Sequence, residues 1–265
     1  MSFLNLENKN FLITGVANKK SVAYFVAKTL LEEKANCYFS VQTVGHKESL
    51  LKLFPDSKVY VCNVESDESV KELGLMLKKE DIKFSGFLHS IAFANFSEGV
   101  KPFHETKTED FLQATNISCF SLVNLANQLK DVLETQSSVV TVSISNTRAT
   151  SYGYLGPIKA ALDATVAFLA KSFSEFSQVR FNAVCAGPLK TSASSGIPDY
   201  IDNYLYAEQL VLRKKALETQ EVANTIVYLL SPASSGMNAG NIVVDGGMAS
   251  NYFDQAIVKS VANKL

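Results

Sequence analysis

Short apolar runs alternate along most of the chain with longer stretches in which apolar residues recur every three or four positions. The short runs, bounded by polar residues or glycine, predict buried strands at residues 10–15, 37–42, 58–64, 86–92, 138–144, 180–185 and 241–244. The longer stretches predict helices at about 21–34, 47–53, 67–79, 108–133, 154–176 and 219–230. This alternation predicts an α/β fold: a doubly wound parallel sheet of about seven strands, covered by helices on both faces. Such a sheet binds ligands beyond the carboxyl ends of its strands.

The 265 residues contain no linker, repeat or low-complexity segment, so we expect a single domain over 1–265. The one long stretch with neither pattern runs from Gly187 to Ala216. A loop of that length inside a compact domain is usually functional.

Composition narrows the possible partners and the compartment. The formal charge is -1 with acids and bases interspersed, which argues against nucleic acid or an anionic membrane as a partner. The sequence lacks a signal-peptide pattern and an apolar run of membrane-spanning length, so we expect a cytoplasmic protein with no membrane span. The four cysteines lack C-x-x-C spacing and sit in apolar runs, which predicts buried free thiols, and the three histidines have no second ligand at metal spacing, so we expect no metal site.

The stretch from Val139 to Lys159 carries candidate chemistry. A buried strand ends in polar residues at Ser143, and Tyr152 and Lys159 are seven residues apart, close to two helical turns, so both can lie on one helix face. An ammonium beside a phenol lowers the pKa of that phenol, which would make Tyr152 a better acid toward an oxyanion. Taken alone, the same pattern also fits tyrosines that only pack.

The turn between the first predicted strand and helix fits a phosphate site. Gly15 permits a tight turn, Ser21 can cap the helix, and backbone N–H groups at a helix start suit a pyrophosphate. The later glycines of G-x-G-x-x-G are absent, so an ordinary strand–helix turn is an equal alternative.

Other strand ends carry polar residues suited to a dinucleotide. Gln42 ends the second predicted strand, where an acidic residue often binds the adenosine ribose. A neutral amide with no following arginine favours NADH over NADPH, although His46 and Lys47 are close. Asn63 could meet the adenine, and Ser90–Ala92 would lie under the nicotinamide ribose.

Together these segments resemble the short-chain dehydrogenase/reductase superfamily, which has a Rossmann-type fold, and more narrowly the bacterial-type NADH-dependent enoyl-acyl-carrier-protein reductases. The matching segments span nearly the whole chain in order: TGVANKKSVAY (14–24), SVQ (40–42), VCNV (61–64), LHSIAFA (88–94), NISCFSLVNLA (116–126), RFNAVCAGPLKTSASSGI (180–197) and VVDGG (243–247). Ordinary superfamily members use Tyr-x3-Lys, whereas the Tyr-x6-Lys spacing here is typical of enoyl reductases.

The resemblance implies roles for individual residues. Tyr152 would hydrogen-bond the thioester carbonyl and stabilise the enolate formed by hydride transfer, and Lys159 would bind the nicotinamide ribose. The cofactor would contact Gly15, Ser21, Val22, Gln42, Asn63, Val64, Ser90, Ile91, Ala92, Lys159, Pro188 and Thr191, with Gly99 near its path. The substrate would contact Phe93, Ala94, Tyr152, Ala193, Ile197 and Tyr200. Residues 191–216 would form a substrate-binding lid, in which Tyr204 and Tyr206 would help to cover the acyl chain.

Two positions depart from the enoyl reductases. Ser143 stands where that family has a second tyrosine, and Asn116 stands at an acidic position; both match ordinary dehydrogenases. Tyr154 is a competing candidate for the acid. We therefore expect an NADH-dependent enzyme, with NADPH possible, that reduces the 2,3 double bond of an enoyl thioester carried by acyl carrier protein. A reductase of another carbonyl or enone in a specialised pathway, and a non-catalytic Rossmann-fold binding protein, remain alternatives. The resemblance also implies a homotetramer, and small residues along 154–176 suit a subunit interface.

Overall fold

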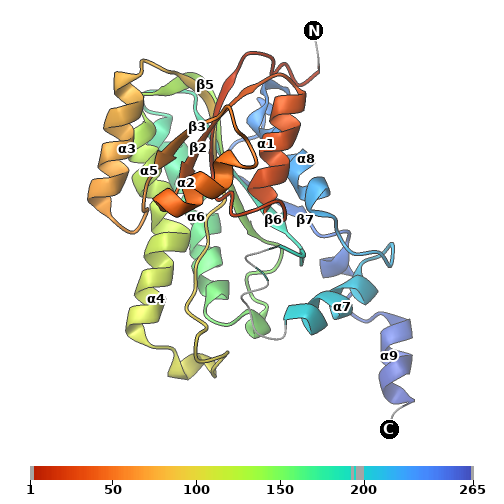
Figure 1. Cartoon of the computed structure of the whole chain (residues 1–265). Helices are drawn as coiled ribbons and strands as arrows, with labels where there is room; N and C mark the ends of the chain where they lie inside the picture. The colour runs from red at the N-terminus through yellow and green to blue at the C-terminus, as the bar shows by residue number, and fades with distance from the viewer. Residues whose placement is uncertain (1–2, 192–193, 195–199, 264–265) are drawn as a thin grey trace.

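A computed structural model of the chain describes residues 3–191, 194 and 200–263. Its centre is one parallel sheet of seven strands in the order β3-β2-β1-β4-β5-β6-β7, which confirms the predicted fold class (Figure 1). The strands are β1 (Asn10–Thr14), β2 (Asn36–Val41), β3 (Lys58–Val61), β4 (Phe84–His89), β5 (Leu133–Ile144), β6 (Arg180–Ala186) and β7 (Gly240–Val244). β5 begins earlier than predicted because Leu133 pairs with Phe84 beyond a register shift.

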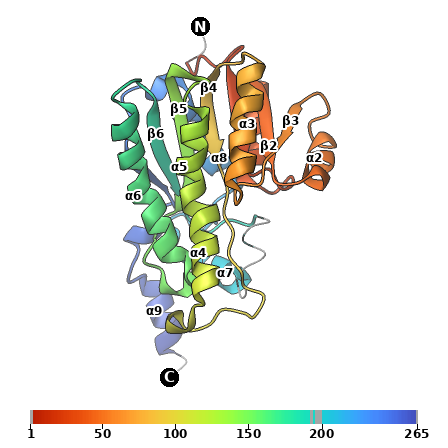
Figure 2. The same ribbon diagram turned by 90° about the vertical axis from the view of Figure 1, so that its left-hand side faces the viewer.

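Helices cover both faces of this sheet. They are α1 (Val22–Glu32), α2 (Val44–Leu51), α3 (Asp67–Lys79), α4 (Thr108–Thr115), α5 (Ser121–Leu129), α6 (Leu155–Phe173), α7 (Tyr200–Leu210), α8 (Thr219–Leu230) and α9 (Gln255–Ala262). Figure 2 looks onto the face covered by α3, α5 and α6, and α1 and α8 pack together on the opposite face (Figure 1).

The two-sided burial of the strands explains their continuous apolar runs. Neighbouring residues of a strand point to opposite faces. Ile13 belongs to the core under α1 and α8, whereas its neighbour Leu12 belongs to the core under α3, α5 and α6. Leu88 and Phe87 of β4 divide in the same way. Both faces of the central strands are therefore largely apolar, although a few buried polar residues such as Thr141 and Asn182 lie within strands.

The predicted helix over 108–133 is interrupted. A π-helical turn, η2 (Asn116–Phe120), separates α4 from α5. Within it, the Ser118 hydroxyl accepts a hydrogen bond from the Phe93 N–H at 2.8 Å and donates one to the Phe93 carbonyl at 2.9 Å. The apolar period cannot show this interruption because an extra residue in one turn barely changes the spacing.

The stretch from 187 to 216, predicted as irregular, contains α7. Tyr204 and Ala207 of α7 are buried, whereas Ile201, Leu205 and Tyr206 are exposed. Apolar side chains on both faces remove the periodicity that would reveal a helix. α9, which was not predicted, lies away from the sheet near the C-terminus (Figure 1). Within the described ranges, we find no helix whose length and apolar character would let it cross a membrane.

The strand order places the ligand-binding edge. Within the sheet, β2 and β3 follow one another on one side of β1, and the chain then crosses over to place β4 on the other side of β1. The loops after β1 and β4 therefore diverge and leave a crevice at their carboxyl ends.

Candidate active site

A cleft of about 610 Å³ opens at the carboxyl ends of the central strands. Most of the predicted site residues line it: Gly15, Ser21, Val22, Gln42, Asn63, Val64, Ser90, Ile91, Ala92, Phe93, Ser143, Tyr152, Lys159, Thr191 and Tyr200. Segments distant in sequence thus meet in one cavity, as the parallel sheet requires.

Four predicted contacts are not among the residues that line the cleft. Ala94 packs against the core under α3, α5 and α6, and its substrate contact stays a prediction. Pro188 does not line the cleft, although its neighbours Gly187 and Leu189 do. Ala193 and Ile197 lie outside the described residues.

Gly15 brings the ends of β1 and β4 together. Its φ is +87°, and a Cβ added there would lie 1.9 Å from the Ser90 carbonyl oxygen. Beside it, the Thr14 hydroxyl donates to the Leu88 carbonyl at 2.9 Å and accepts from the Ser90 N–H at 3.3 Å. The tight approach that the sequence predicted at Gly15 is therefore present, and a larger residue does not fit.

The start of α1 faces this turn without a side-chain cap. Ser21 occupies the N-cap position, but its hydroxyl donates to the Asn18 carbonyl at 2.7 Å, so the predicted capping role is wrong. Among the described residues, no side chain caps this end and the first turn holds no acid. Uncapped N–H groups and the positive end of the helix dipole suit the negative charge of a pyrophosphate.

The adenosine end of the cleft is formed after β2 and β3. Gln42 is exposed directly after β2, and His46 lines the same wall. The Asn63 side-chain oxygen accepts from the Glu65 N–H at 3.3 Å, which holds a turn after β3. The contacts of these side chains with a ribose and a base stay predictions.

Lys159 lies near the start of α6 at the inner end of the cleft. Its side chain is 4 % exposed, and Nζ donates to the Val142 carbonyl at 2.9 Å. Burial lowers the pKa of Lys159 to about 8. His89, fully buried on β4, has its pKa lowered to about 3 by burial and by Lys159, so it is neutral near pH 7.

Tyr152 does not share a helix with Lys159, contrary to the sequence prediction. It ends a 3₁₀ turn (Thr150–Tyr152), and Gly153 with φ of +62° separates that turn from α6. The predicted lowering of its pKa is also wrong in this structure, because burial, with a smaller effect of Tyr200, raises the pKa of Tyr152 to about 12. Tyr152 is therefore a neutral hydrogen-bond donor in the cleft.

Ser143 lies at the end of β5, and its side chain is almost wholly buried. Its hydroxyl helps to lower the pKa of the nearby Asp163 carboxyl, although no described residue meets hydrogen-bond geometry with it. Asn116 does not join this group: its amide donates to the Glu65 carbonyl at 3.4 Å, and it does not line the cleft. The group of asparagine, serine, tyrosine and lysine that ordinary dehydrogenases use, with Asn116 as its first member, therefore does not come together in this cleft.

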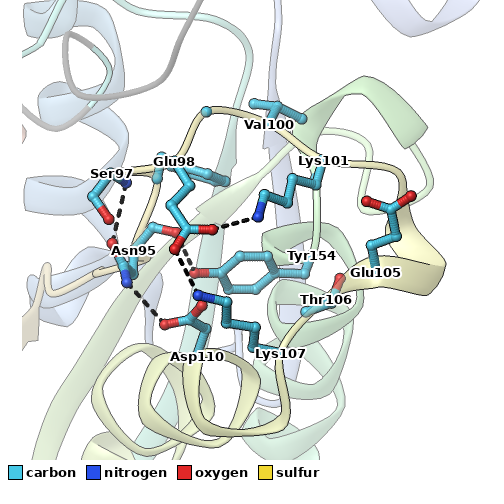
Figure 3. Close-up of a pocket in the computed structure, with 13 residues that line it drawn as sticks. Asn95, Ser97, Glu98, Val100, Lys101, Glu105, Thr106, Lys107, Asp110 and Tyr154 are labelled. Atoms are coloured by element: carbon cyan, nitrogen blue, oxygen red, sulfur yellow. Dashed lines mark hydrogen bonds and ion pairs between the residues drawn. The ribbon is translucent and has the colours of Figure 1, made fainter.

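A smaller pocket of about 40 Å³ is lined by residues 95–101, 105–107, 110 and 153–154 (Figure 3). Tyr154 points into it and donates to the Asn95 carbonyl at 3.1 Å. Glu98 accepts from Lys107 at 2.7 Å and also pairs with Lys101. Tyr154 is thus outside the cleft, which rules against it as the acid. Gly99 lines this smaller pocket and not the cleft, and its place near the cofactor path stays a prediction.

The described part of the predicted lid is tied to the cleft at its start. The Tyr200 hydroxyl accepts from the Leu189 N–H at 2.9 Å, and the Ser194 hydroxyl donates to the Leu189 carbonyl at 2.8 Å. Ser194 is a lining residue that sequence reasoning missed. Tyr204 and Tyr206 do not line the cleft; the Tyr204 ring is buried and lies 4.4 Å from Lys190 Nζ.

Sequence reasoning also missed the wall supplied by the α4–η2 segment. Gln113 and Ile117 line the cleft, and the Gln113 amide donates to the Glu65 carboxylate at 2.8 Å. The four cysteines are buried and free, as predicted. Over the described ranges, no three acidic, histidine or cysteine side chains gather where they could hold a metal ion.

A cleft at the switch in strand order, a glycine turn leading to an uncapped helix, and a tyrosine and a buried lysine at its inner end define a dinucleotide-dependent oxidoreductase. A family model described as "Enoyl-(Acyl carrier protein) reductase" matches residues 15–249. This chain belongs to that family.

Named relatives align with this sequence over almost the whole chain. Enoyl-[acyl-carrier-protein] reductase [NADPH] FabI of Staphylococcus aureus (strain MRSA252) is 35% identical, over 92% of this chain and 98% of its own. The [NADH] FabI of Enterococcus faecalis is 33% identical, over 92% and 98%. The crystal structure of enoyl-[acyl-carrier-protein] reductase (NADH) from Aquifex aeolicus VF5 superposes with a TM-score of 0.86 at 31% identity, covering 92% of this chain and 97% of that one.

Proposed function

We propose that this chain reduces the 2,3 double bond of an enoyl thioester carried by acyl carrier protein, in fatty-acid biosynthesis, with NADH or NADPH as reductant. The observation that carries this proposal is the meeting of Tyr152 and Lys159 with the uncapped start of α1 in one cleft. Membership in the enoyl-(acyl carrier protein) reductase family supports the choice of substrate.

The cleft fits a nicotinamide dinucleotide. The absence of a side chain at Gly15 lets the turn after β1 approach the Ser90 backbone closely, which is the kind of tight glycine turn that dinucleotide-binding folds use beside a pyrophosphate. Gly15, Ser21 and Val22 would hold the pyrophosphate. Gln42 would face the adenosine ribose, and Asn63 and Val64 would face the adenine. The nicotinamide ribose would contact Ser90, Ile91, Ala92 and Lys159. Pro188 and Thr191 would lie near the nicotinamide amide and the pyrophosphate. When bound, the dinucleotide supplies the hydride.

Residues of the chain then stabilise the negative charge that develops on the substrate. Because burial keeps its phenol neutral, Tyr152 can donate a hydrogen bond to the thioester carbonyl oxygen, where charge accumulates as an enolate forms. The Lys159 ammonium adds positive potential at the same end of the cleft. Phe93 and Tyr200 would contact the acyl chain, and residues 191–216 would form a lid that excludes water.

The test is oxidation of NADH by the purified chain with a trans-2-enoyl thioester, beside a 3-ketoacyl thioester. Consumption with the enoyl substrate alone is the expected result. Ser143, which stands where the family has a second tyrosine, favours ketone reduction as the second candidate. Turnover with the ketone alone would establish that candidate and overturn the proposal.

The neutral amide at Gln42 is expected to favour NADH. Gln42→Arg should improve kcat/KM for NADPH relative to NADH by about tenfold, because a guanidinium pairs with the 2'-phosphate that the amide cannot neutralise. Gln113→Arg, on another wall of the cleft, serves as the control for added charge. An unchanged cofactor ratio in Gln42→Arg would show that Gln42 does not face the ribose.

We also propose that the chain forms a homotetramer and acts in the cytoplasm. Large apolar side chains are exposed on and just after α6 and on the α4–η2 segment, at Phe168, Phe176, Leu112 and Phe120. Such a surface suits subunit contacts. Light scattering should give four times the chain mass of 28.9 kDa. The buried free thiols suit a reducing compartment, and cell fractionation tests that location.

A further inference from the structure

A carboxylate lies behind the cleft, one helical turn beyond Lys159. Asp163 follows Lys159 by four residues on α6, so the two side chains lie on the same helix face. On the sheet side, the Cys185 thiol donates to the Asp163 carboxylate at 3.9 Å. Cys185 is the register partner of Ser143 on the neighbouring strand. The Asp163 side chain therefore extends from α6, which also carries Lys159, toward the neighbouring strands that carry Cys185 and Ser143.

The described groups around Lys159 other than Asp163 are neutral near pH 7. Burial raises the pKa of Cys119 on η2, and raises that of Cys185 on β6 to about 12. His89 and Tyr152 are neutral for the reasons given above. The direct partner of the ammonium, the Val142 carbonyl, is uncharged. Asp163 is thus the anionic group that acts on Lys159 among the described residues.

The surroundings of Asp163 act on its carboxyl in two opposite directions. Burial raises the pKa of Asp163, and Ser143, Lys159 and Cys185 oppose that effect. Asp163 in turn is the largest influence that opposes the loss of the proton from buried Lys159. Each member of this cluster therefore favours the charged form of another.

We propose that Asp163 is a positioning residue for the reduction: its carboxylate, which Ser143 and Cys185 help to stabilise, keeps buried Lys159 in the ammonium form that the site uses. This rests on the proposed function, because it assigns work to the Lys159 charge. It also gives Ser143 a place in the site without a direct part in the chemistry.

The sign of the effect follows from the burial of Lys159. Burial alone favours the neutral amine, and the nearby carboxylate counteracts it. Removing the carboxylate lowers the pKa of Lys159 further below about 8, so the ammonium is lost at lower pH. The alkaline limb of the pH profile should therefore move to lower pH, while its acid side stays in place.

The experiment measures kcat/KM for the enoyl thioester and, separately, the Kd of NADH, from about pH 6 to about pH 9. For Asp163→Asn we expect the alkaline limb of both profiles to move down by roughly one pH unit, a loss of about fivefold at pH 8 relative to wild type. Asp163→Glu, which keeps the charge, should restore most of the profile. Lys159→Arg removes the titrating amine and identifies the limb, because a guanidinium stays protonated.

The control is Glu175→Gln in the turn just after α6, where Glu175 pairs with Lys171 of α6 at 3.6 Å, also four residues apart but at an exposed site. It should leave both profiles unchanged. Superimposed wild-type and Asp163→Asn profiles would overturn the proposal. So would an equal loss in Asp163→Glu, which would mean a structural role. If Asp163→Asn does not fold, Asp163→Ser provides the same comparison. If wild type turned over no enoyl thioester, the proposed function would fail while the NADH profiles still tested Asp163.

Discussion

Tyr152→Phe is expected to lower kcat for enoyl reduction by about 10²- to 10⁴-fold, the range typical of a lost general acid or proton donor. Tyr152 lines the inner end of the cleft, and burial keeps its phenol protonated. Phenylalanine retains the ring and removes the hydroxyl that we propose donates to the thioester oxygen. The Kd of NADH should change little, because the proposed partner of this hydroxyl is the substrate. Steady-state kinetics and a binding titration check both parts.

Tyr154→Phe is the matched control. The Tyr154 hydroxyl donates to the Asn95 carbonyl in the smaller pocket (Figure 3). Its removal should cost about 1 kcal/mol of stability, the usual value of one hydrogen bond, and leave kcat within about twofold. Full activity in Tyr152→Phe would remove Tyr152 from the mechanism, and an equal loss in both variants would point to a packing effect.

Gly15→Ala is expected to destabilise the chain by about 3 kcal/mol or more and to abolish NADH binding. Alanine is strained at a φ of +87°, and its Cβ would meet the Ser90 carbonyl oxygen at 1.9 Å. Relief of that clash must separate the ends of β1 and β4, which frame the proposed pyrophosphate site. Urea unfolding measures the first effect and a fluorescence titration with NADH measures the second.

Gly45→Ala provides the comparison for this glycine. Gly45 is the second residue of α2, where the nearest atom to an added Cβ is the Thr43 hydroxyl oxygen at 3.9 Å. Alanine there should stabilise the chain by at most about 0.5–1 kcal/mol, the gain known for a helix interior. Wild-type stability and NADH affinity in Gly15→Ala would mean that the β1–β4 junction tolerates a side chain.

The sheet was predictable because each central strand is buried on both faces. That condition leaves a continuous apolar run such as Phe11–Ile13, which few other structures produce. Polar residues that follow such a run mark the end of the strand, so Gln42, Asn63, Ser90 and Ser143 could be placed on one edge. The place of a residue along a strand follows directly from its order in the sequence.

The hydrogen-bond partners of individual side chains could not be predicted from the sequence in the same way. Ser21 stands at a helix start as expected, but its hydroxyl turns back to the Asn18 carbonyl. Asn116 has the residue type of a dehydrogenase site, yet its amide bonds to the Glu65 backbone. The seven-residue spacing of Tyr152 and Lys159 suggested one helix, and the backbone of Gly153 breaks it. Each outcome depends on a three-dimensional choice among competing hydrogen bonds.

The π-helical turn η2 makes the middle of the chain intolerant of changes in length. Its residues and the next one reach separate parts of the molecule: Ser118 holds Phe93, Cys119 lies 3.8 Å from the Thr165 hydroxyl, and Ser121 bonds to His89 at 2.8 Å. Deleting one residue would restore a regular helix and rotate everything before it by about 100°. All these pairings would then be lost together. Natural variants should accept exchanges of side chains here more readily than insertions or deletions, and engineered loops belong elsewhere in the fold.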